Sequence, residues 1–267
     1  MTATPIQRTL ALTVYGDLAV SEIVKPPANR KPIVTRWIPQ ERSSEAYTRL
    51  RRLLEAGRQA YVVCPVIEES ETRQAKAAEV EAERLRHGEL KGFRVGCLHG
   101  RLKPADRRSL MAQFKAHELD VLVATTVIEV GVDVANSTVM IVQEADRFGL
   151  AQLHQLRGRV GRGGEQSYCL LVSRAKEELT DSALARLEAL VATTDGFELA
   201  EKDLEIRGEG QLLGTRQAGY SDLKFTRLRS DRMLLEQARE AAERLVDYEG
   251  PLNDEVDRVF EGKEVQA

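Results

Sequence analysis

The sequence lacks any long uninterrupted apolar run. No stretch reaches the roughly 18 uncharged apolar residues that a membrane-spanning helix needs, and the opening MTATPIQRTL has neither a basic leader nor an apolar signal core. We therefore expect a cytoplasmic protein with no membrane partner. With 42% hydrophobic and 30% charged residues among 267, the composition is typical of a globular protein with a sizeable buried core.

Cysteine is scarce, and its spacing is not that of a paired or metal-binding set. Cys64, Cys97 and Cys169 lie far apart, each within an apolar run, so neither a disulfide framework nor a zinc site is indicated. Free cysteine is among the most buried residue types. We expect all three thiols in the core and no metal site.

An excess of positive charge is also absent. The net charge of −3 argues against a protein that coats nucleic acid through bulk charge, so any contact with DNA has to be local. Arginine is nevertheless dense in two places, which are candidates for phosphate contacts, although a solvated helix face is the alternative for the last three positions. The arginines are Arg157, Arg159 and Arg162, then Arg207, Arg216, Arg227, Arg229 and Arg232.

Apolar runs alternate with amphipathic stretches between residues 31 and 175. The runs are nearly continuous in Val, Ile and Leu, as strands buried on both faces require. This alternation predicts an α/β fold in which helices flank a parallel sheet. The expected strands lie in IVTRWI, AYVVCPVI, FRVGCLHG, DVLVATT, STVMIVQEA and SYCLLVS, and the expected helices at 43–56, 70–90, 104–117 and 151–157.

The two ends of the chain differ from this pattern. Prolines at 5, 26 and 27 interrupt regular structure, and we expect an extended connector over residues 1–30. From about residue 176 the chain becomes rich in Ala, Leu, Arg and Glu, with expected helices at 179–191 and 230–247 around a Gly-rich segment. We expect a helical hairpin module there.

The strongest local motif is QLRGRVGR at 155–162. Its glycines permit close approach of another group, and guanidinium forks suit bidentate phosphate contacts. An arginine that reaches the terminal phosphate of a nucleotide stabilises the charge that develops in phosphoryl transfer, an effect worth about 10³–10⁵ in rate. Arg159 and Arg162 are the candidates for this role. A basic loop that holds carboxylates or a helix end is the alternative.

A second motif, ATTVIEVGVD at 124–133, directly follows an expected strand. Groups just past the carboxyl end of a parallel strand lie where open α/β sheets bind ligands, so Thr125 and Thr126 are candidates for contact with a nucleic-acid phosphate. Gly131 and Asp133 belong to a tight acidic turn. Asp133 can accept a ribose hydroxyl or orient an arginine, and a helix-capping or turn carboxylate is the alternative.

In this order and separation, the two motifs resemble motifs V and VI of superfamily 2 helicases, and Thr2-Ala-Thr-Pro-Ile resembles motif III. ATTVIEVGVDV, EADRFGLAQLHQLRGRVGRG and DGFELAEKDLEIRGEGQLLGTRQAG are similar to segments shared by the RecG helicases and the transcription-repair coupling factors. AYVVCPVIEESE and GTRQ resemble RecG more closely. The resemblance extends to about residue 220 and implies a RecA-like sheet domain.

The resemblance also implies roles for individual positions. Those implied to face ATP are Gly131, Asp133, Gln155, Arg159 and Arg162, the last two with a catalytic role. Those implied to contact DNA are His99, Gly100, Thr125 and Thr126. For His99, a histidine satisfied within the sheet edge is an equal alternative. Those implied to couple ATP hydrolysis to translocation are Thr2, Ala3, Thr4, Arg207, Arg216 and Gln217.

The same resemblance implies a division of the chain. Residues 1–30 would be the end of the first motor lobe and the interlobe linker, 31–175 the C-terminal helicase lobe, and 176–267 the helical hairpin translocation module with a C-terminal helix. The 267 residues contain no G-x-x-x-x-G-K-[ST], and no Asp-Glu box precedes the motif III segment. We therefore expect ATP and Mg²⁺ to bind mainly on a first lobe outside this chain, and the isolated chain to be inactive and without cofactor.

As a whole, the resemblance implies part of an ATP-dependent DNA helicase that acts on branched or forked duplex DNA in fork reversal, branch migration, recombination and repair. An N-terminal wedge domain and the first motor lobe would be its partners. Two alternatives stay open: the matching part of a transcription-repair coupling factor, and a standalone module that binds DNA or a partner without catalysis.

Overall fold

The computed structural model describes residues 31–65, 71–125 and 134–207, together with Gln237, Glu240, Ala241 and Arg244. These last four are helical and fall within the predicted helix at 230–247, whose other residues lie outside the described part, as do residues 1–30. The chain divides into two units, and the fold below is that of the unit containing the sheet. No helix in the described ranges is long and apolar enough to cross a bilayer.

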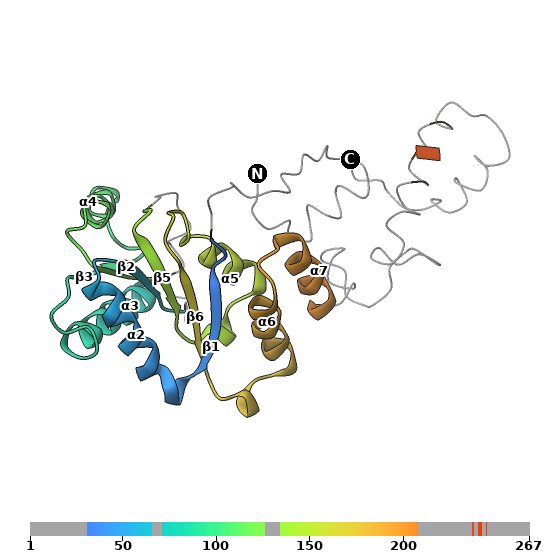
Figure 1. Cartoon of the computed structure of the whole chain (residues 1–267), viewed down its shortest axis with the longest axis horizontal. Coiled ribbons are helices and arrows are strands. Elements are labelled where there is room, and N and C mark those ends of the chain that lie inside the picture. The colour runs from blue at the N-terminus through green and yellow to red at the C-terminus, as the bar shows by residue number, and fades with distance from the viewer. Residues whose placement is uncertain are drawn as a thin grey trace. The chain divides into compact units, whose positions relative to one another are not determined.

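A parallel sheet of six strands is the centre of this unit, as the alternation of apolar runs predicts (Figure 1). The strand order is β1-β6-β5-β2-β4-β3, and every neighbouring pair is parallel. Strands β2, β4 and β5 are buried along their whole length, which explains their continuous apolar sequences. The strands are β1 Val34–Pro39, β2 Gln59–Val63, β3 Val95–Leu98, β4 Val121–Ala124, β5 Ser137–Val142 and β6 Tyr168–Ser173.

Helices cover both faces of the sheet. Side chains of α2 (Ser43–Glu55) and α3 (Glu71–His87) pack into one apolar cluster, and those of α4 (Pro104–Lys115), α5 (Leu150–Arg157) and α6 (Asp181–Ala192) pack into the other. Helix α7 (Gly196–Arg207) packs against α5 and α6. Short 3-10 turns lie at Gln40–Arg42 (η1), Ala145–Arg147 (η3) and Lys176–Glu178 (η4).

Helix α2 illustrates how sequence spacing sets these elements. Ala46, Leu50 and Leu54 recur every four residues and are all buried against the sheet, and each leucine contributes about 1.5–3 kcal/mol by its burial. The helix ends before Gly57, whose φ of +78° is a left-handed conformation that glycine adopts without strain. The four-residue spacing and the glycine after it predicted a helix at 43–56, and the observed bounds, Ser43–Glu55, agree to within one residue.

The order of the strands creates a crevice. Along the chain, β1, β2 and β3 step across the sheet in one direction, and β4, β5 and β6 step back. Since such crossovers are right-handed, the helices that follow the neighbouring strands β2 and β5 lie on opposite faces. Open α/β sheets bind ligands at the carboxyl ends of strands at such a switch point. We call the side of the sheet formed by the carboxyl ends of the strands the carboxyl edge, and the side formed by their amino ends the amino edge.

The predicted burial of the three cysteines is confirmed for two of them. Cys64 and Cys169 are buried, whereas Cys97 on β3 is only half-buried. Strand β3 is an edge strand of the sheet, and this position explains why the thiol of Cys97 is less covered.

Candidate nucleotide-facing and nucleic-acid interfaces

The arginine-rich loop lies at the amino edge of the sheet. It joins α5 to β6, and α5 is anchored by the buried side chains of Leu153 and Leu156. The Gln166 side-chain amide donates to the Pro32 carbonyl at 2.7 Å, and the Val34 amide donates to the Ser167 carbonyl at 2.9 Å. The loop is therefore fixed against the first residues of β1 and β6.

Two glycines allow this loop to lie close to its neighbours. Gly161 has a φ of +74°, and a Cβ there would lie 2.9 Å from Cγ1 of Ile33. At Gly163 a Cβ would lie 2.8 Å from the carbonyl oxygen of Ala135. Ala135 comes two residues after Asp133, so the arginine-rich loop packs directly beside the chain that follows the second motif.

The structure groups three of the predicted ATP-facing residues at this edge. Gln155 lies in the last turn of α5, Arg159 and Arg162 follow within seven residues, and all three side chains are half-buried. Nε of Arg162 donates to the Gly158 carbonyl at 3.2 Å, which orients the guanidinium along the loop. The remaining two predicted positions, Gly131 and Asp133, lie outside the described residues.

Arg157 has a different role from its two neighbours, although the sequence groups it with them. It is 2% exposed, its Nη1 donates to the carbonyls of Leu190 and Thr193 at 2.7 and 2.8 Å, and its Nη2 bonds Nδ1 of His154 at 2.9 Å. Burial lowers the pKa of the guanidinium. The side chain satisfies carbonyls at the end of α6 that have no partner within that helix, and so ties α5 to α6.

The predicted DNA contacts lie at the other side of the sheet, at its carboxyl edge. Strands β3 and β4 are neighbours, and the Thr125 amide donates to the Leu98 carbonyl at 3.2 Å, so Thr125 lies beside His99 and Gly100. Gly100 is exposed, whereas Thr125 is buried. Thr126 is outside the described residues.

His99 is oriented toward a helix. Its side chain is buried, and Nε2 lies 3.0 Å from Oε1 of Glu79 on α3. This geometry favours the alternative of a histidine satisfied within the sheet edge, and the DNA contact stays a prediction.

The described members of the two sets are thus at opposite edges. Gln155, Arg159 and Arg162 lie at the amino edge, and His99, Gly100 and Thr125 lie at the carboxyl edge. Thr125 of the second motif is at the carboxyl edge, and Val134 and Ala135, which directly follow that motif, are at the amino edge.

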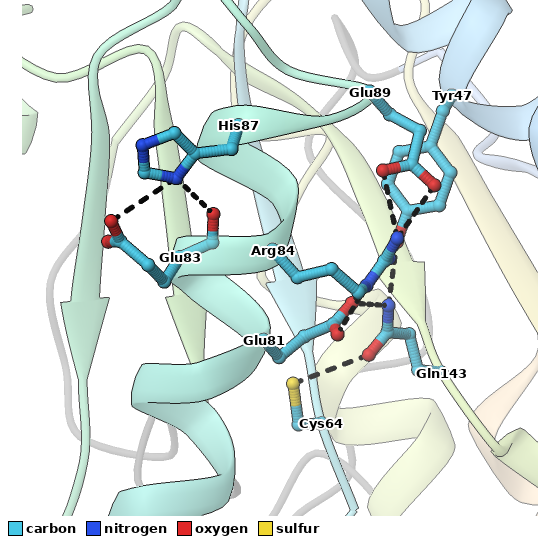
Figure 2. A network of polar contacts seen from close by, with 8 residues as sticks. All are labelled: Tyr47, Cys64, Glu81, Glu83, Arg84, His87, Glu89 and Gln143. Atoms are coloured by element: carbon cyan, nitrogen blue, oxygen red, sulfur yellow. Dashed lines mark hydrogen bonds and ion pairs between the residues drawn. The ribbon is translucent and has the colours of Figure 1, made fainter.

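A polar network at the switch point was not predicted from the sequence (Figure 2). Gln143 follows β5, and its amide donates to the Tyr47 hydroxyl at 2.7 Å and to Glu81 at 2.6 Å, while the Cys64 thiol donates to its carbonyl at 3.4 Å. Arg84 bridges Glu81 and Glu89 at 2.8 Å each. Burial, and then the nearby carboxylate of Glu81, raises the pKa of both the Tyr47 hydroxyl and the Cys64 thiol.

Beside this network is a pocket of about 410 Å³. Glu144, which lines it, has a φ of +45°, a left-handed conformation that costs a non-glycine residue about 1–3 kcal/mol and is enriched at functional sites. The sequence contained a signal for this site, because polar residues directly follow the strand sequence STVMIV. Thr125 was selected by the same rule, that polar groups just past the carboxyl end of a parallel strand are candidates for ligand contact. The arrangement is suited to hold a polar group at the carboxyl edge.

Within the described ranges, no group of three His, Cys, Asp or Glu side chains is placed to hold a metal ion. Arg207 is the last residue of α7. The other predicted coupling positions, Thr2, Ala3, Thr4, Arg216 and Gln217, lie outside the part of the chain that the structure describes.

Two family models match the chain. Residues 45–164 match the helicase conserved C-terminal domain, and residues 193–260 match the C-terminal part of domain 3 of the ATP-dependent DNA helicase RecG. The first match contains both predicted motifs, and the second contains Arg207, Arg216 and Gln217.

Curated relatives agree with these models. The chain is 50% identical over 242 residues to the ATP-dependent DNA helicase RecG of Streptococcus pneumoniae, covering 91% of this chain and 36% of that protein. It is also 50% identical over 243 residues to RecG of Escherichia coli O157:H7, covering 91% and 35%. The chain therefore spans about a third of the length of these relatives.

A solved structure of RecG bound to a three-way DNA junction is similar in fold. The TM-score is 0.68 at 43% identity, and the match covers 88% of this chain and 30% of the other. This agreement extends the sequence match to the arrangement of the sheet and its helices.

Proposed function

Because this chain corresponds to the C-terminal part of the RecG family of DNA helicases, we propose that it supplies the second motor lobe and the translocation module of an ATP-dependent enzyme that remodels branched DNA. The observation that carries the proposal is the loop at the amino edge. There Arg159 and Arg162 are half-buried on a turn that contains two closely packed glycines, whereas Arg157 is buried and bonded to carbonyls at the end of α6.

In the intact motor, Arg159 and Arg162 act across a cleft. ATP with Mg²⁺, held mainly by the first motor lobe, supplies the phosphoryl group that is transferred. The two guanidinium groups of this chain stabilise the charge that develops on the terminal phosphate. Gln155 helps to position the nucleotide at the same edge, and we assign the same role to Gly131 and Asp133, which lie outside the described residues.

Closing and opening of that cleft moves the loop and its helix together. Since Arg157 binds carbonyls at the end of α6, a displacement of α5 is passed to α6 and from there to α7, which ends at Arg207. Arg207, Arg216 and Gln217 belong to the translocation module in residues 176–267. Thr2, Ala3 and Thr4, at the end of the first motor lobe, link ATP hydrolysis to DNA binding. A rigid helical lever of this kind is a common means of amplifying a small closure.

The DNA partner is a branched or forked duplex. A RecG relative is solved with a three-way junction, and we place the DNA path of this chain along the carboxyl edge, near Gly100, Thr125 and Thr126. Selection of the branch itself belongs to an N-terminal wedge domain. The enzyme is expected to work in the cytoplasm, where its chromosomal substrate lies.

The experiment that tests this function is ATP hydrolysis stimulated by forked DNA. The chain is assayed alone, then mixed with a separately produced first motor lobe and wedge domain from the same protein. We expect no hydrolysis by the chain alone, because its 267 residues contain no phosphate-binding G-x-x-x-x-G-K-[ST]. We expect hydrolysis in the mixture, and a loss of about 10³-fold or more with Arg159→Ala.

The control is Lys91→Ala, which removes a cation from the exposed surface far in sequence from the loop. It should leave the mixture active. Hydrolysis by the chain alone, or a mixture whose rate does not change with Arg159→Ala, would contradict the proposal.

A further inference from the structure

A basic groove runs along the face of the sheet that carries α2. Two adjoining hollows of about 490 and 360 Å³ form it, and they share Glu45 and Arg49. The floor is made by β1 and β6, and the wall by α2. We define the basic groove by Arg36, Arg42, Arg49, Arg52, Tyr168 and Leu170.

The sheet explains why this face is open. Strand β1 is an edge strand, and among the described strands it pairs only with β6. The apolar cluster on this face draws on α2 and α3, and the floor residues Arg36 and Tyr168 are left exposed and half-buried. A six-residue strand is about 20 Å long, so the groove has room for an extended ligand.

The charges in the groove are strongly unbalanced. Among the described residues that line the two hollows, Glu45 is the one acidic residue, and both of its oxygens accept from Arg42, at 2.7 and 2.8 Å. The guanidinium of Arg49 lies 4.5 Å from the centre of the Tyr168 ring. In the described part of the chain, the exposed side chains of Arg36 and Arg52 form neither an ion pair nor a hydrogen bond.

We propose that the basic groove is a second contact for the phosphate backbone of duplex DNA, at the β1 side of the sheet and distinct from the predicted contacts that follow β3 and β4. The proposal rests on the function proposed above. Guanidinium groups are suited to phosphate, and a duplex presents one negative charge per roughly 1.7 Å of its axis. A duplex laid along the groove therefore meets all four arginines without needing a particular sequence.

The charge of the groove favours DNA over an acidic protein. Stable protein interfaces depend on a buried aromatic or arginine anchor that fills a pocket in the partner. Here the ring of Tyr168 is already stacked under Arg49, and Leu170 in the floor is buried, so neither of these side chains is available as an anchor. The arginines instead line an exposed trough, which suits a uniform polyanion.

The test is binding of a fluorescent 30-base-pair duplex, followed by anisotropy over a series of salt concentrations. The variant is Arg36→Gln with Arg49→Gln and Arg52→Gln, and the control is Lys76→Gln with Lys91→Gln and Lys115→Gln. Both variants remove three exposed positive charges. We expect the arginine variant to lose at least tenfold in affinity at low salt and its salt dependence to fall by about 2–3 units of slope. The lysine variant should stay within threefold of the parent chain.

Several results would overturn the inference. Equal affinities of the arginine and lysine variants would do so, as would a parent chain that binds no duplex. Binding of polyglutamate in preference to the duplex would assign the groove to an acidic protein instead. Circular dichroism and a denaturation midpoint show whether the arginine variant is folded; if it is not, Arg36→Gln alone is measured under the same criterion, with an expected loss of about threefold.

The two proposals fail separately. A mixture of motor halves that hydrolyses ATP, with unchanged duplex binding by the arginine variant, would remove the groove and keep the motor. Duplex binding through the groove without hydrolysis in the mixture would remove the motor and keep the groove.

Discussion

Gly163 lies against the backbone of Ala135 so closely that a Cβ on the glycine would be 2.8 Å from the alanine carbonyl oxygen. The contact joins the arginine-rich loop to the chain that follows the second motif. Because the nearest atom belongs to a backbone, it cannot rotate away. We expect Gly163→Ala to lower the free energy of unfolding by about 1–3 kcal/mol, measured by denaturation in guanidinium chloride.

The neighbouring glycine is the control. No atom lies within 4 Å of a Cβ built on Gly164, so Gly164→Ala should change stability by less than about 1 kcal/mol. Equal losses in the two variants would mean that the loop does not pack on Ala135.

Arg157 and Arg159 should respond oppositely to the same substitution. Arg157→Met keeps the length of the side chain but leaves the Leu190 and Thr193 carbonyls without their donor. Relief of the buried charge offsets part of this loss, so we expect a destabilisation of about 1–3 kcal/mol. Arg159→Met, at a half-buried position, should cost less than about 1 kcal/mol but abolish ATP hydrolysis in the reconstituted motor.

Denaturation and hydrolysis measured on the same two proteins separate these effects. A fully stable Arg157→Met protein would show that the tie between α5 and α6 is unimportant for the fold.

The sheet was predictable because its strands are buried on both faces. In runs such as AYVV and STVMIV the apolar residues are consecutive and do not alternate with polar ones, and this pattern fits strands covered by helices on both sides. Helix α2 was predictable for the complementary reason, since its apolar residues recur at one-turn spacing and Gly57 follows them. Both signals are local in sequence.

The role of Arg157 was not predictable, because its partners are remote. Leu190 and Thr193 are 33 and 36 residues further along the chain and contribute backbone oxygens, which carry no mark in the sequence. The network around Gln143 was not predicted for the same reason, since its side chain contacts Tyr47, Glu81 and Cys64, which come from three separate segments of the chain. The density of arginine identified the loop in the sequence. Only the packing in the fold shows that Arg157 is buried while Arg159 and Arg162 are half-buried.

Asp120 gives the stability a defined pH dependence. Its carboxylate accepts from the Arg94 amide at 2.8 Å and from the Arg94 guanidinium at 3.0 and 2.6 Å. Burial by itself raises the pKa of Asp120, but the hydrogen bonds and the charge of Arg94 outweigh it, and the net effect is a lowered pKa. The folded state therefore binds this proton less readily than the unfolded state, whose Asp has a pKa of about 3.9.

The resulting stabilisation is fully present above that unfolded value and is lost as the pH falls through the lowered pKa of the folded state. We expect Asp120→Asn to be less stable than the parent by about 1 kcal/mol at pH 7, with Arg94 half exposed and partly screened. The difference should shrink below about pH 4. Glu41→Gln, an exposed carboxylate, serves as control, and a difference for Asp120→Asn that is constant from pH 7 to pH 3 would contradict this account.

His99 allows a direct choice between a structural and a DNA-binding role. The ring is buried and directed at Glu79, and its Nδ1 has no hydrogen-bond partner among the described residues. If the role is structural, His99→Ala should lower the free energy of unfolding by about 1–3 kcal/mol and leave duplex affinity within threefold of the parent. Glu79→Gln retains an acceptor for the ring and should be milder. A tenfold loss of duplex affinity in His99→Ala, with an unchanged denaturation midpoint, would reverse this assignment, because a buried packing residue cannot act on DNA without first affecting the fold.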